Sequence, residues 1–267
     1  MKIAFFGAGK MGEAILSGLL KKGFKKDEIF VSEIFQDRLN FIKEKYGING
    51  SNKNIDALNF GDILISAVKP QNLKDLSEEL KNEDFKDKIL LSIMAGVKIE
   101  KIFESFKVKK VVRTMPNINA QIGEAVTLWT DVGLNNDEKE FVKNILSSFG
   151  KEVYVIKEDY IDIGTSISGS GPAYVFYFLD SLIDAGVYLG LSRDVSEKLA
   201  VQTILGSILL KERTNEEAHK LIHMVTSPGG TTIEALYKFD ENRLKYSIMS
   251  GVIEAYKKSK ALGESKK

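Results

Sequence analysis

The chain has 267 residues, enough for one large domain or two of ordinary size, and 43% of them are hydrophobic. Its 38 Lys and Arg residues balance 37 Asp and Glu residues, so the net charge of +1 gives no electrostatic footprint for nucleic acid. It contains no cysteine, which excludes disulfides and thiol chemistry and agrees with a reducing, cytoplasmic location. The first expected strand starts at residue 2 and no apolar run approaches ~18 residues, so we expect no signal peptide and no membrane partner.

The N-terminal segment predicts a dinucleotide site. An apolar run at residues 2–6 leads directly into a glycine turn and then a helical pattern over residues 13–22, the turn being Gly7-Ala8-Gly9-Lys10-Met11-Gly12. Strand, turn and helix in this order are the context that the Gly-x-Gly-x-x-Gly pattern requires. Gly7 permits the tight turn, Gly9 lets a pyrophosphate approach the backbone, and Gly12 lets the helix pack against the strand. We expect the phosphates to bind the free N–H groups where the helix starts.

The first 160 residues alternate strand-like and helical patterns, which predicts an α/β fold with a doubly wound, mostly parallel sheet. Further strands are expected at residues 29–32, 62–68, 88–93, 110–114, 125–129 and 152–156, and helices at 36–46, 72–81, 99–106 and 137–149. Only helical patterns follow, at 160–167, 173–189, 193–211, 215–225, 232–239 and 241–262, with Gly263 just past the last helix. We therefore expect one domain at residues 1–160 and an all-helical domain at residues 161–267.

The end of the second strand holds the residues that would meet the ribose of the cofactor. Glu33 lies 21 residues beyond Gly12, near the spacing at which an acid accepts hydrogen bonds from the ribose hydroxyls. A carboxylate there favours NADH, because it repels a ribose phosphate. Arg38 could instead bind such a phosphate, and Glu33 could be an ordinary surface residue. The choice between NADH and NADPH therefore stays open, with a lean to NADH.

Three later strand ends point to the same crevice, because open α/β sheets bind ligands at the carboxyl ends of their strands. Lys69, before the helix-starting Pro70, would line the cofactor path or reach water. Ala95 and Gly96 are small enough for the nicotinamide half to lie against the backbone, although their spacing alone fits an ordinary turn. Asn117 follows the next strand and offers both a donor and an acceptor.

Two glycine-rich turns mark the helical half. Residues 168–174, Ser-Gly-Ser-Gly-Pro-Ala-Tyr, open a long helix that Ser170 could cap and whose first turn suits Pro172. That helix is apolar nearly all round, so it is a core helix or a subunit interface. Residues 226–232, Thr-Ser-Pro-Gly-Gly-Thr-Thr, bring hydroxyls and free N–H groups to a helix start without a fixed charge. This second turn suits a small carboxylate, or is a capped loop between helices.

We expect no metal site. His219 and His223 lie four residues apart on a helical pattern, but no third ligand is evident, so we interpret them as surface or packing residues. Asp180 and Asp184 could form an acid–base pair, although a polar stripe on a helix explains them more simply.

Four segments together resemble the pyrroline-5-carboxylate reductases, namely residues 7–12, Ala67-Val68-Lys69-Pro70, residues 168–174 and residues 225–232. They occur in the family's order, and the last two are specific to it, so the resemblance covers essentially the whole chain. It implies reduction of 1-pyrroline-5-carboxylate to L-proline with NADPH or NADH, the last step of proline synthesis. It also implies a Rossmann domain followed by a helical dimerisation domain, whose dimers can assemble into decamers.

The resemblance also implies roles for individual residues. The residues expected along the cofactor are Gly7, Ala8, Gly9, Lys10, Met11, Gly12, Ser32, Glu33, Ala67, Val68, Lys69, Pro70, Ala95 and Gly96. Those expected to grip the substrate carboxylate are Ser227, Pro228, Gly229, Gly230, Thr231 and Thr232, with Thr165 orienting the ring. Members that prefer NADPH usually carry small polar residues where this chain has Glu33, so the chain departs from that pattern.

Such a reaction needs little acid–base machinery, because a protonated cyclic imine is already electrophilic. We therefore expect orientation to dominate and no side chain to be an obligatory proton donor. A β-hydroxyacid dehydrogenase is the alternative enzyme, but it would need a catalytic lysine, and none of Lys198, Lys211 and Lys220 lies in a glycine-rich setting. A nucleotide-sensing protein without turnover is the other alternative, and the turn at residues 226–232 argues against it.

Overall fold

The computed structural model describes residues 1–264, with side chains described through residue 261. The chain divides into two compact units, one formed by Met1–Ser170 with the end of the chain from Ala255, the other by Gly171–Glu254. Among the described residues, no helix is both long and apolar enough to cross a membrane.

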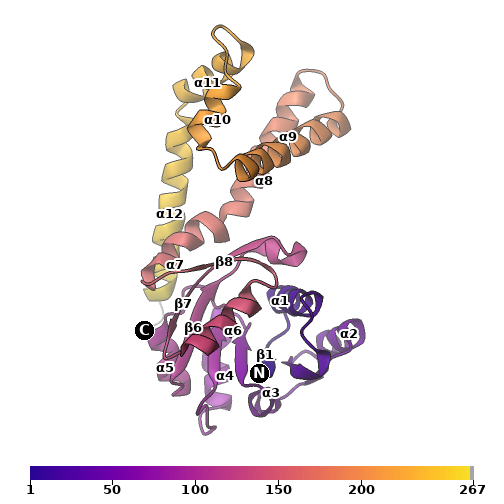
Figure 1. The fold of residues 1–267 in the computed structure, drawn as a ribbon, viewed down its shortest axis with the longest axis vertical. Coiled ribbons are helices and arrows are strands. Elements are labelled where there is room, and N and C mark those ends of the chain that lie inside the picture. The colour runs from indigo at the N-terminus through magenta and orange to yellow at the C-terminus, as the bar shows by residue number, and fades with distance from the viewer. Residues whose placement is uncertain (265–267) are drawn as a thin grey trace. The chain divides into compact units, whose positions relative to one another are not determined.

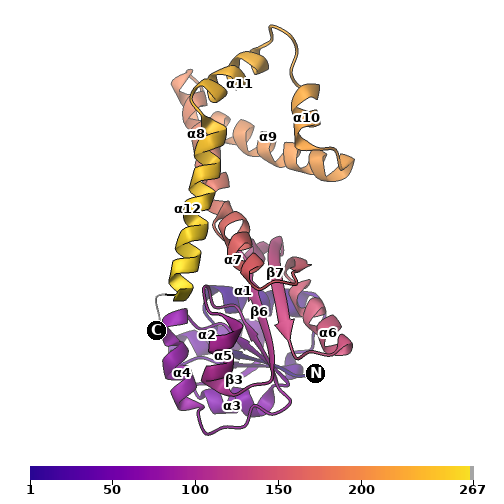
Figure 2. The same cartoon turned by 90° about the vertical axis from the view of Figure 1, so that its left-hand side faces the viewer.

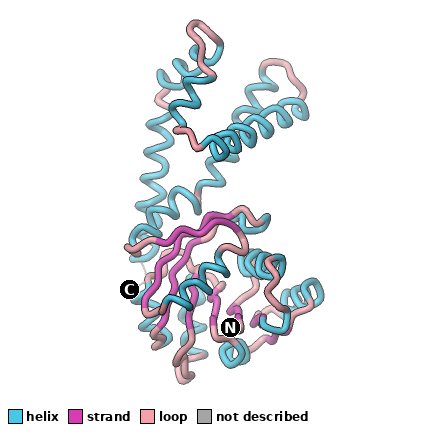
Figure 3. The backbone as a smooth tube through the Cα atoms, in the orientation of Figure 1, coloured by secondary structure: helices cyan, strands magenta, loops and turns pink. Residues whose placement is uncertain are grey.

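The first unit is built on an eight-stranded sheet, whose strands are drawn as arrows in Figure 1 and in magenta in Figure 3. The strand order is β3-β2-β1-β4-β5-β6-β7-β8, and of these pairs only β6–β7 is antiparallel. Its strands are β1 (Ile3–Phe6), β2 (Ile29–Ser32), β3 (Asn49–Ser51), β4 (Ile63–Ser66), β5 (Ile89–Ser92), β6 (Lys110–Met115), β7 (Ala125–Val132) and β8 (Gly150–Tyr154). Its helices are α1 (Lys10–Lys21), α2 (Gln36–Tyr46), α3 (Asn54–Phe60), α4 (Leu73–Glu79), α5 (Ile99–Phe106), α6 (Asn136–Leu146) and α7 (Asp159–Gly164). The predicted doubly wound, mostly parallel sheet is thereby confirmed.

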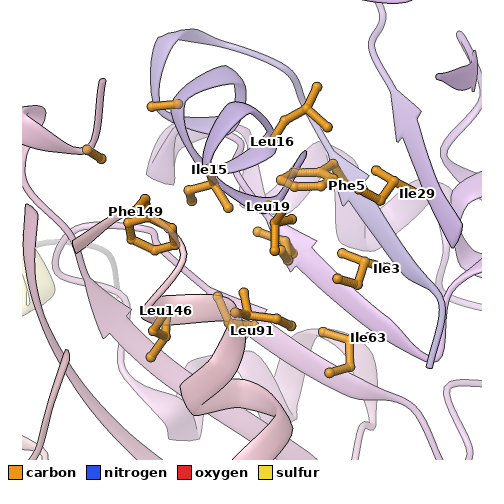
Figure 4. Close-up of a cluster of buried hydrophobic side chains, with 14 of the residues drawn as sticks. Ile3, Phe5, Ile15, Leu16, Leu19, Ile29, Ile63, Leu91, Leu146 and Phe149 are labelled. Carbon is orange, nitrogen blue, oxygen red and sulfur yellow. The ribbon is translucent and has the colours of Figure 1, made fainter. Parts of the chain in front are cut away.

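The central strands are buried on both faces, because helices cover the sheet from either side. Successive side chains of β1 point to opposite faces, so Ile3 and Phe5 enter one core while Ala4 and Phe6 enter the other. The first core packs against α1, α2 and α6 and includes Phe149 (Figure 4). The second core packs against α3, α4 and α5.

The second unit is helical, as predicted, and contains α8 (Gly171–Tyr188), α9 (Arg193–Thr214), α10 (Ala218–Met224), α11 (Thr231–Glu241) and most of α12 (Leu244–Glu264), which are labelled in Figures 1 and 2. Within this unit α8 packs against α9. Much of the apolar surface of α8 remains uncovered in the single chain, for example at Phe176 and Tyr177. That exposure favours the interface alternative for this helix over a core position.

Several predicted boundaries were wrong. Strand β3 and helix α3 were not predicted, because Asn49-Gly50-Ser51 carries none of the apolar alternation of a strand. Helices α10 and α12 begin three residues later than expected. Asn215, the C-cap of α9, and Arg243, just before α12, both have a positive φ, which is not helical. Helix α12 continues through Gly263 to Glu264.

Ser170 does not cap the long helix as expected. A π-helical turn, η4 (Thr165–Gly169), precedes it, and Ser170 itself has helical dihedral angles, with φ −86° and ψ −21°. The chain therefore passes from η4 into α8 without the extended residue that an N-cap requires.

Candidate functional site

Four parallel neighbouring strands, β2, β1, β4 and β5, bring the predicted cofactor residues to one edge of the sheet. The register pairs Phe6 with both Ser32 and Ser66, and pairs Ser66 with Ser92, so these four strand ends lie level. The glycine turn, Glu33, the segment from Ala67 to Pro70, and the segment with Ala95 and Gly96 all follow these ends. The carboxyl edge of a parallel sheet is where α/β folds bind ligands.

The glycine turn has the close packing that its pattern predicts. Gly7 adopts a φ of 89°, and its N–H donates to the carbonyl of Ser32 at 2.8 Å. A β-carbon on Gly12 would lie 2.9 Å from the carbonyl oxygen of Gly7 and 3.3 Å from the β-carbon of Ala67. Any larger residue at position 12 would therefore push helix α1 away from the strand ends.

Gly9 differs from Gly7 and Gly12, because a β-carbon on Gly9 would meet nothing within 4 Å. Gly9 is also the N-cap residue of the 12-residue helix α1, and no side chain caps that end. The first N–H groups of a helix have no partner within the helix, and the helix dipole favours an anion beside them. The open space over Gly9 thus fits a pyrophosphate, which Lys10 and Met11 would adjoin.

At the end of β2, the hydroxyl of Ser32 is buried and used inside the protein. Its oxygen lies 3.0 Å from the carbonyl oxygen of Phe5 and 2.6 Å from Oδ1 of Asn54, so its single proton is shared between these two acceptors. The Asn54 amide in turn donates to Glu79 at 2.7 Å. Asn54 is a buried polar residue beside Ser32 that sequence reasoning missed, because it lies in the unpredicted helix α3.

Glu33 is buried, with 7% of its surface exposed, and its carboxylate is held by the backbone. One oxygen accepts the N–H of Ala8 at 2.9 Å, and the other accepts the N–H of Phe35 at 3.1 Å. The carboxylate therefore lies against the glycine turn rather than in solvent. An ordinary surface glutamate would not be fixed in this way.

Arg38 forms a second link to the glycine turn. Its Nε donates to the carbonyl of Ala8 at 2.7 Å, and its Nη2 pairs with the carboxylate of Glu13 on α1. Lys45 and Tyr46 also donate to Glu13, each at 2.8 Å. Burial raises the pKa of Glu13, but these hydrogen bonds outweigh it and lower the pKa to about 2. Sequence reasoning missed this cluster, because its members lie on two helices.

The ends of β4 and β5 present small or exposed groups. Ala67 donates its N–H to the carbonyl of Phe6 at 2.9 Å and lies against Gly12. Val68 is half-buried, and Lys69 is exposed and extended before the short helix that Pro70 starts. Ala95 is exposed and is followed by Gly96, which has a φ of 73°.

Thr165 lies in the π-helical turn η4, beyond the end of α7. Its hydroxyl donates to the carbonyl of Ile161 at 2.7 Å, so its proton is used inside the helix. Asn117, after β6, donates to the carbonyl of Ser168 in the same turn at 3.1 Å. The turn is thereby tied to the sheet edge, and the hydroxyl oxygen of Thr165 can still accept a hydrogen bond.

The predicted substrate turn belongs to the second unit and joins α10 to α11. Gly229 has a φ of 67°, and a β-carbon on Gly230 would lie 2.5 Å from Oγ of Ser227. Gly230 is the N-cap residue of α11, with no side-chain cap. Ser227, Pro228, Thr231 and Thr232 are exposed or half-buried around it. The turn therefore has an uncapped helix start with hydroxyl side chains in the adjoining residues, features that suit a small carboxylate.

The residues considered for metal or acid–base chemistry form no such site. Among the described residues, no cluster of three or more metal-binding side chains exists. His219 is exposed and lies 3.3 Å from Glu217. Asp180 and Asp184 both pair with Arg193 at 3.2 Å on the exposed surface of α8 and α9. That pairing fits a polar stripe.

Comparison with known proteins agrees with this geometry. Residues 158–262 match the family model for pyrroline-5-carboxylate reductase dimerisation, and residues 2–96 match that of the coenzyme F420-dependent NADP oxidoreductases. A pyrroline-5-carboxylate reductase of Methanosarcina acetivorans is 36% identical over 98% of both chains.

Two solved structures share the fold over 98% of both chains. The pyrroline-5-carboxylate reductase of Coxiella burnetii has a TM-score of 0.91 at 31% identity. The Plasmodium falciparum pyrroline carboxylate reductase, solved with NADP bound, has a TM-score of 0.88 at 34% identity. With these similarities over nearly its full length, the chain belongs to the pyrroline-5-carboxylate reductase family.

Proposed function

We propose that this chain reduces 1-pyrroline-5-carboxylate to L-proline, the last step of proline biosynthesis, by hydride transfer from NADPH or NADH. The observation that carries the proposal is the pair of uncapped helix starts, one behind the open space at Gly9 and one behind the tight Ser227–Gly230 turn. The first suits a dinucleotide, and the second suits a small carboxylate. Full-length relatives with the name of this reductase support the same reaction.

The cofactor residues we assign all lie at the edge where β1, β2, β4 and β5 end. Gly7, Ala8, Gly9, Lys10, Met11 and Gly12 hold the pyrophosphate, and Ser32 and Glu33 form the ribose end. Ala67, Val68, Lys69, Pro70, Ala95 and Gly96 line the path to the nicotinamide, which supplies the hydride when the cofactor is bound. The open space at Gly9 and the small side chains at Ala67 and Ala95 support this assignment.

The substrate residues we assign are Ser227, Pro228, Gly229, Gly230, Thr231 and Thr232. Their N–H and hydroxyl groups bind the carboxylate and so fix the orientation of the substrate ring. Orientation of this kind can supply ~7–11 kcal/mol of the barrier reduction. Thr165 has an orienting role only, because its own proton is donated to Ile161.

The helical part of the chain forms homo-oligomers. Its match to a dimerisation family and the uncovered apolar side chains of α8 support this role. We extend the proposal to a homodimer that assembles into a decamer, without nucleic-acid or membrane partners, in the cytoplasm. In this assignment residues 1–160 bind the cofactor, and residues 161–267 dimerise and bind the substrate.

One assay tests the function directly. Oxidation of NADH and NADPH by the purified full-length protein is followed with 1-pyrroline-5-carboxylate, and reduction of NAD+ and NADP+ is followed with a panel of β-hydroxyacids. Turnover with the imine alone is the expected result. Turnover only with a hydroxyacid would make the chain a dehydrogenase of that class, and nucleotide binding without any turnover would make it a sensor.

A further inference from the structure

The ribose end of the cofactor site contains one anion that is fixed in place. Both carboxylate oxygens of Glu33 accept backbone N–H groups, from Ala8 at 2.9 Å and from Phe35 at 3.1 Å. Each oxygen keeps a further lone pair, so the group can still accept hydrogen bonds from ribose hydroxyls. A phosphate on the same ribose would instead meet a negative charge that cannot swing away.

Arg38, the cation nearest to Glu33 in the sequence, already has hydrogen-bond and ion-pair partners inside the protein. Arg38 donates through Nε to the carbonyl of Ala8 at 2.7 Å and through Nη2 to Glu13. Only 28% of its side chain is exposed. Two bonds to different elements hold the guanidinium, so it cannot turn to a phosphate without losing both.

Glu13 binds a second cation as well. Lys45 donates to Glu13 at 2.8 Å, so one carboxylate pairs with both Arg38 and Lys45. With a pKa of about 2, Glu13 stays ionised throughout the physiological range. Helix α2 carries three positive charges, and two of them, Arg38 and Lys45, are therefore held by Glu13.

We propose that this chain selects NADH against NADPH by two residues, Glu33, which repels a 2′-phosphate, and Glu13, which withholds Arg38 and Lys45 from it. Glu13 is a positioning residue, because it acts on the cofactor only through the cations. The inference rests on the proposed function for the identity of the cofactor. It predicts that removal of Glu33 alone relaxes the selection, and that removal of both acids is needed to reverse it.

The test measures dissociation constants for NADH and NADPH by calorimetry, without substrate, on the full-length protein. The variants are Glu33→Ser, Glu13→Gln and the double variant, and AMP and 2′-AMP serve as probes without nicotinamide. We expect the wild type to bind NADH at least tenfold more tightly than NADPH, and Glu33→Ser to reduce that ratio. We expect the double variant to shift the ratio further than the product of the two single shifts.

Two further arms separate the causes. In the double variant, Arg38→Gln or Lys45→Gln should remove the gain for NADPH and 2′-AMP, which identifies the released cation. Glu138→Gln is the matched control, because it breaks an ion pair with Lys110 at the amino end of β6, away from the carboxyl ends of the strands. This variant should leave the ratio unchanged. Glu13→Ala replaces Glu13→Gln if the latter does not fold, as judged by circular dichroism.

Two results would overturn the inference. One is a wild type that binds NADPH as tightly as NADH, and the other is a double variant whose effect equals the product of the single ones. Failure of the proposed function has a different signature, which is selective NADH binding without any reduction of 1-pyrroline-5-carboxylate. The binding ratio and the turnover assay therefore fail independently.

Discussion

The guanidinium of Arg113 lies 2.6 Å from the carboxylate of Asp162, and both side chains are buried, with Arg113 only 2% exposed. Arg113 also donates to Glu158 at 3.0 Å, and Glu158 accepts the N–H of Ile99 at the start of α5. One buried cation thus joins β6 to the start of α7 and, through Glu158, to α5. Helix α7 leads directly into the turn that holds Thr165, so this pair fixes the base of that turn.

Removal of Arg113 should therefore destabilise the first unit strongly. Loss of one partner of a buried pair leaves an uncompensated charge and costs about 3–5 kcal/mol. We expect Arg113→Ala to lower the free energy of unfolding by about that amount, measured by urea denaturation with circular dichroism. Lys101→Ala is the control, because its pair with Glu104 is exposed and such pairs contribute about 0–1 kcal/mol. Equal effects of the two variants would contradict a structural role for the buried pair.

Gly9→Ala should weaken nucleotide binding without unfolding the protein. The added β-carbon meets no protein atom within 4 Å, so it occupies the space that we assign to the pyrophosphate. We expect a loss of affinity of at least tenfold for NADH and NADPH alike, with the thermal midpoint within a few degrees of wild type. Gly206→Ala is the control, since that glycine also faces open space but lies in α9. Undiminished binding in Gly9→Ala would remove the pyrophosphate from this turn.

Gly230→Ala should impair the substrate turn alone. Its β-carbon would lie 2.5 Å from Oγ of Ser227, so that hydroxyl must leave the position it has beside Gly230. We expect the KM for 1-pyrroline-5-carboxylate to rise at least tenfold while the dissociation constants of the nucleotides stay unchanged. Gly251→Ala in α12 is the matched control, because its β-carbon meets nothing within 4 Å. A parallel loss of nucleotide affinity would show that the variant disturbs more than this turn.

Much of the fold could be predicted from local patterns. Strands β1, β4 and β5 are buried on both faces, so each appears in the sequence as an uninterrupted run of mostly apolar residues that is easily recognised. Strand β3 could not be found this way, because Asn49-Gly50-Ser51 forms the edge of the sheet and is held by pairing with β2. A β-carbon on Gly50 would lie 2.6 Å from the carbonyl of Val31, which explains a glycine that local propensity disfavours.

The candidate site likewise has features that the sequence predicts and features that only the fold reveals. The glycine turns are contiguous in sequence, so their spacing alone indicated anion sites. The partners of their flanking residues are not contiguous, since Glu13 and Arg38 come from different helices, and Asn54 reaches Ser32 from a third. Sequence spacing predicted a ribose-binding role for Glu33, but only the fold revealed that the N–H of Ala8 holds its carboxylate.

Thr165→Val tests whether a side-chain proton donor is needed. The Thr165 hydroxyl donates to Ile161 at 2.7 Å, and valine keeps its shape, so the helix should persist. We expect kcat to fall by less than about tenfold at unchanged KM and stability, because general acid catalysis typically contributes ~10²–10⁴-fold. A loss of more than about a thousandfold in single-turnover hydride transfer would instead make this hydroxyl the proton donor. Ser166→Ala is the control, since Ser166 is buried in the same turn and bonds to Ile163.

Glu13 should stabilise the fold in a pH-dependent way. Its pKa is lowered from 4.5 to about 2 in the folded protein, so its contribution is fully present above pH of about 4.5 and is lost as the pH falls toward 2. The shift corresponds to at most about 3 kcal/mol at neutral pH, since one pKa unit equals ~1.4 kcal/mol.

We therefore expect Glu13→Gln to lower the free energy of unfolding by about 1–3 kcal/mol at pH 7, and by progressively less below pH of about 4.5. Urea denaturation of both proteins between pH 7 and 3 measures the difference directly. Glu138→Gln gives a comparison, because Lys110 and the backbone of Asn135 outweigh burial and lower the pKa of Glu138 as well. A stability difference for Glu13→Gln that stays constant across this range would mean that packing of the side chain, rather than its charge, holds Arg38 and Lys45 against α1.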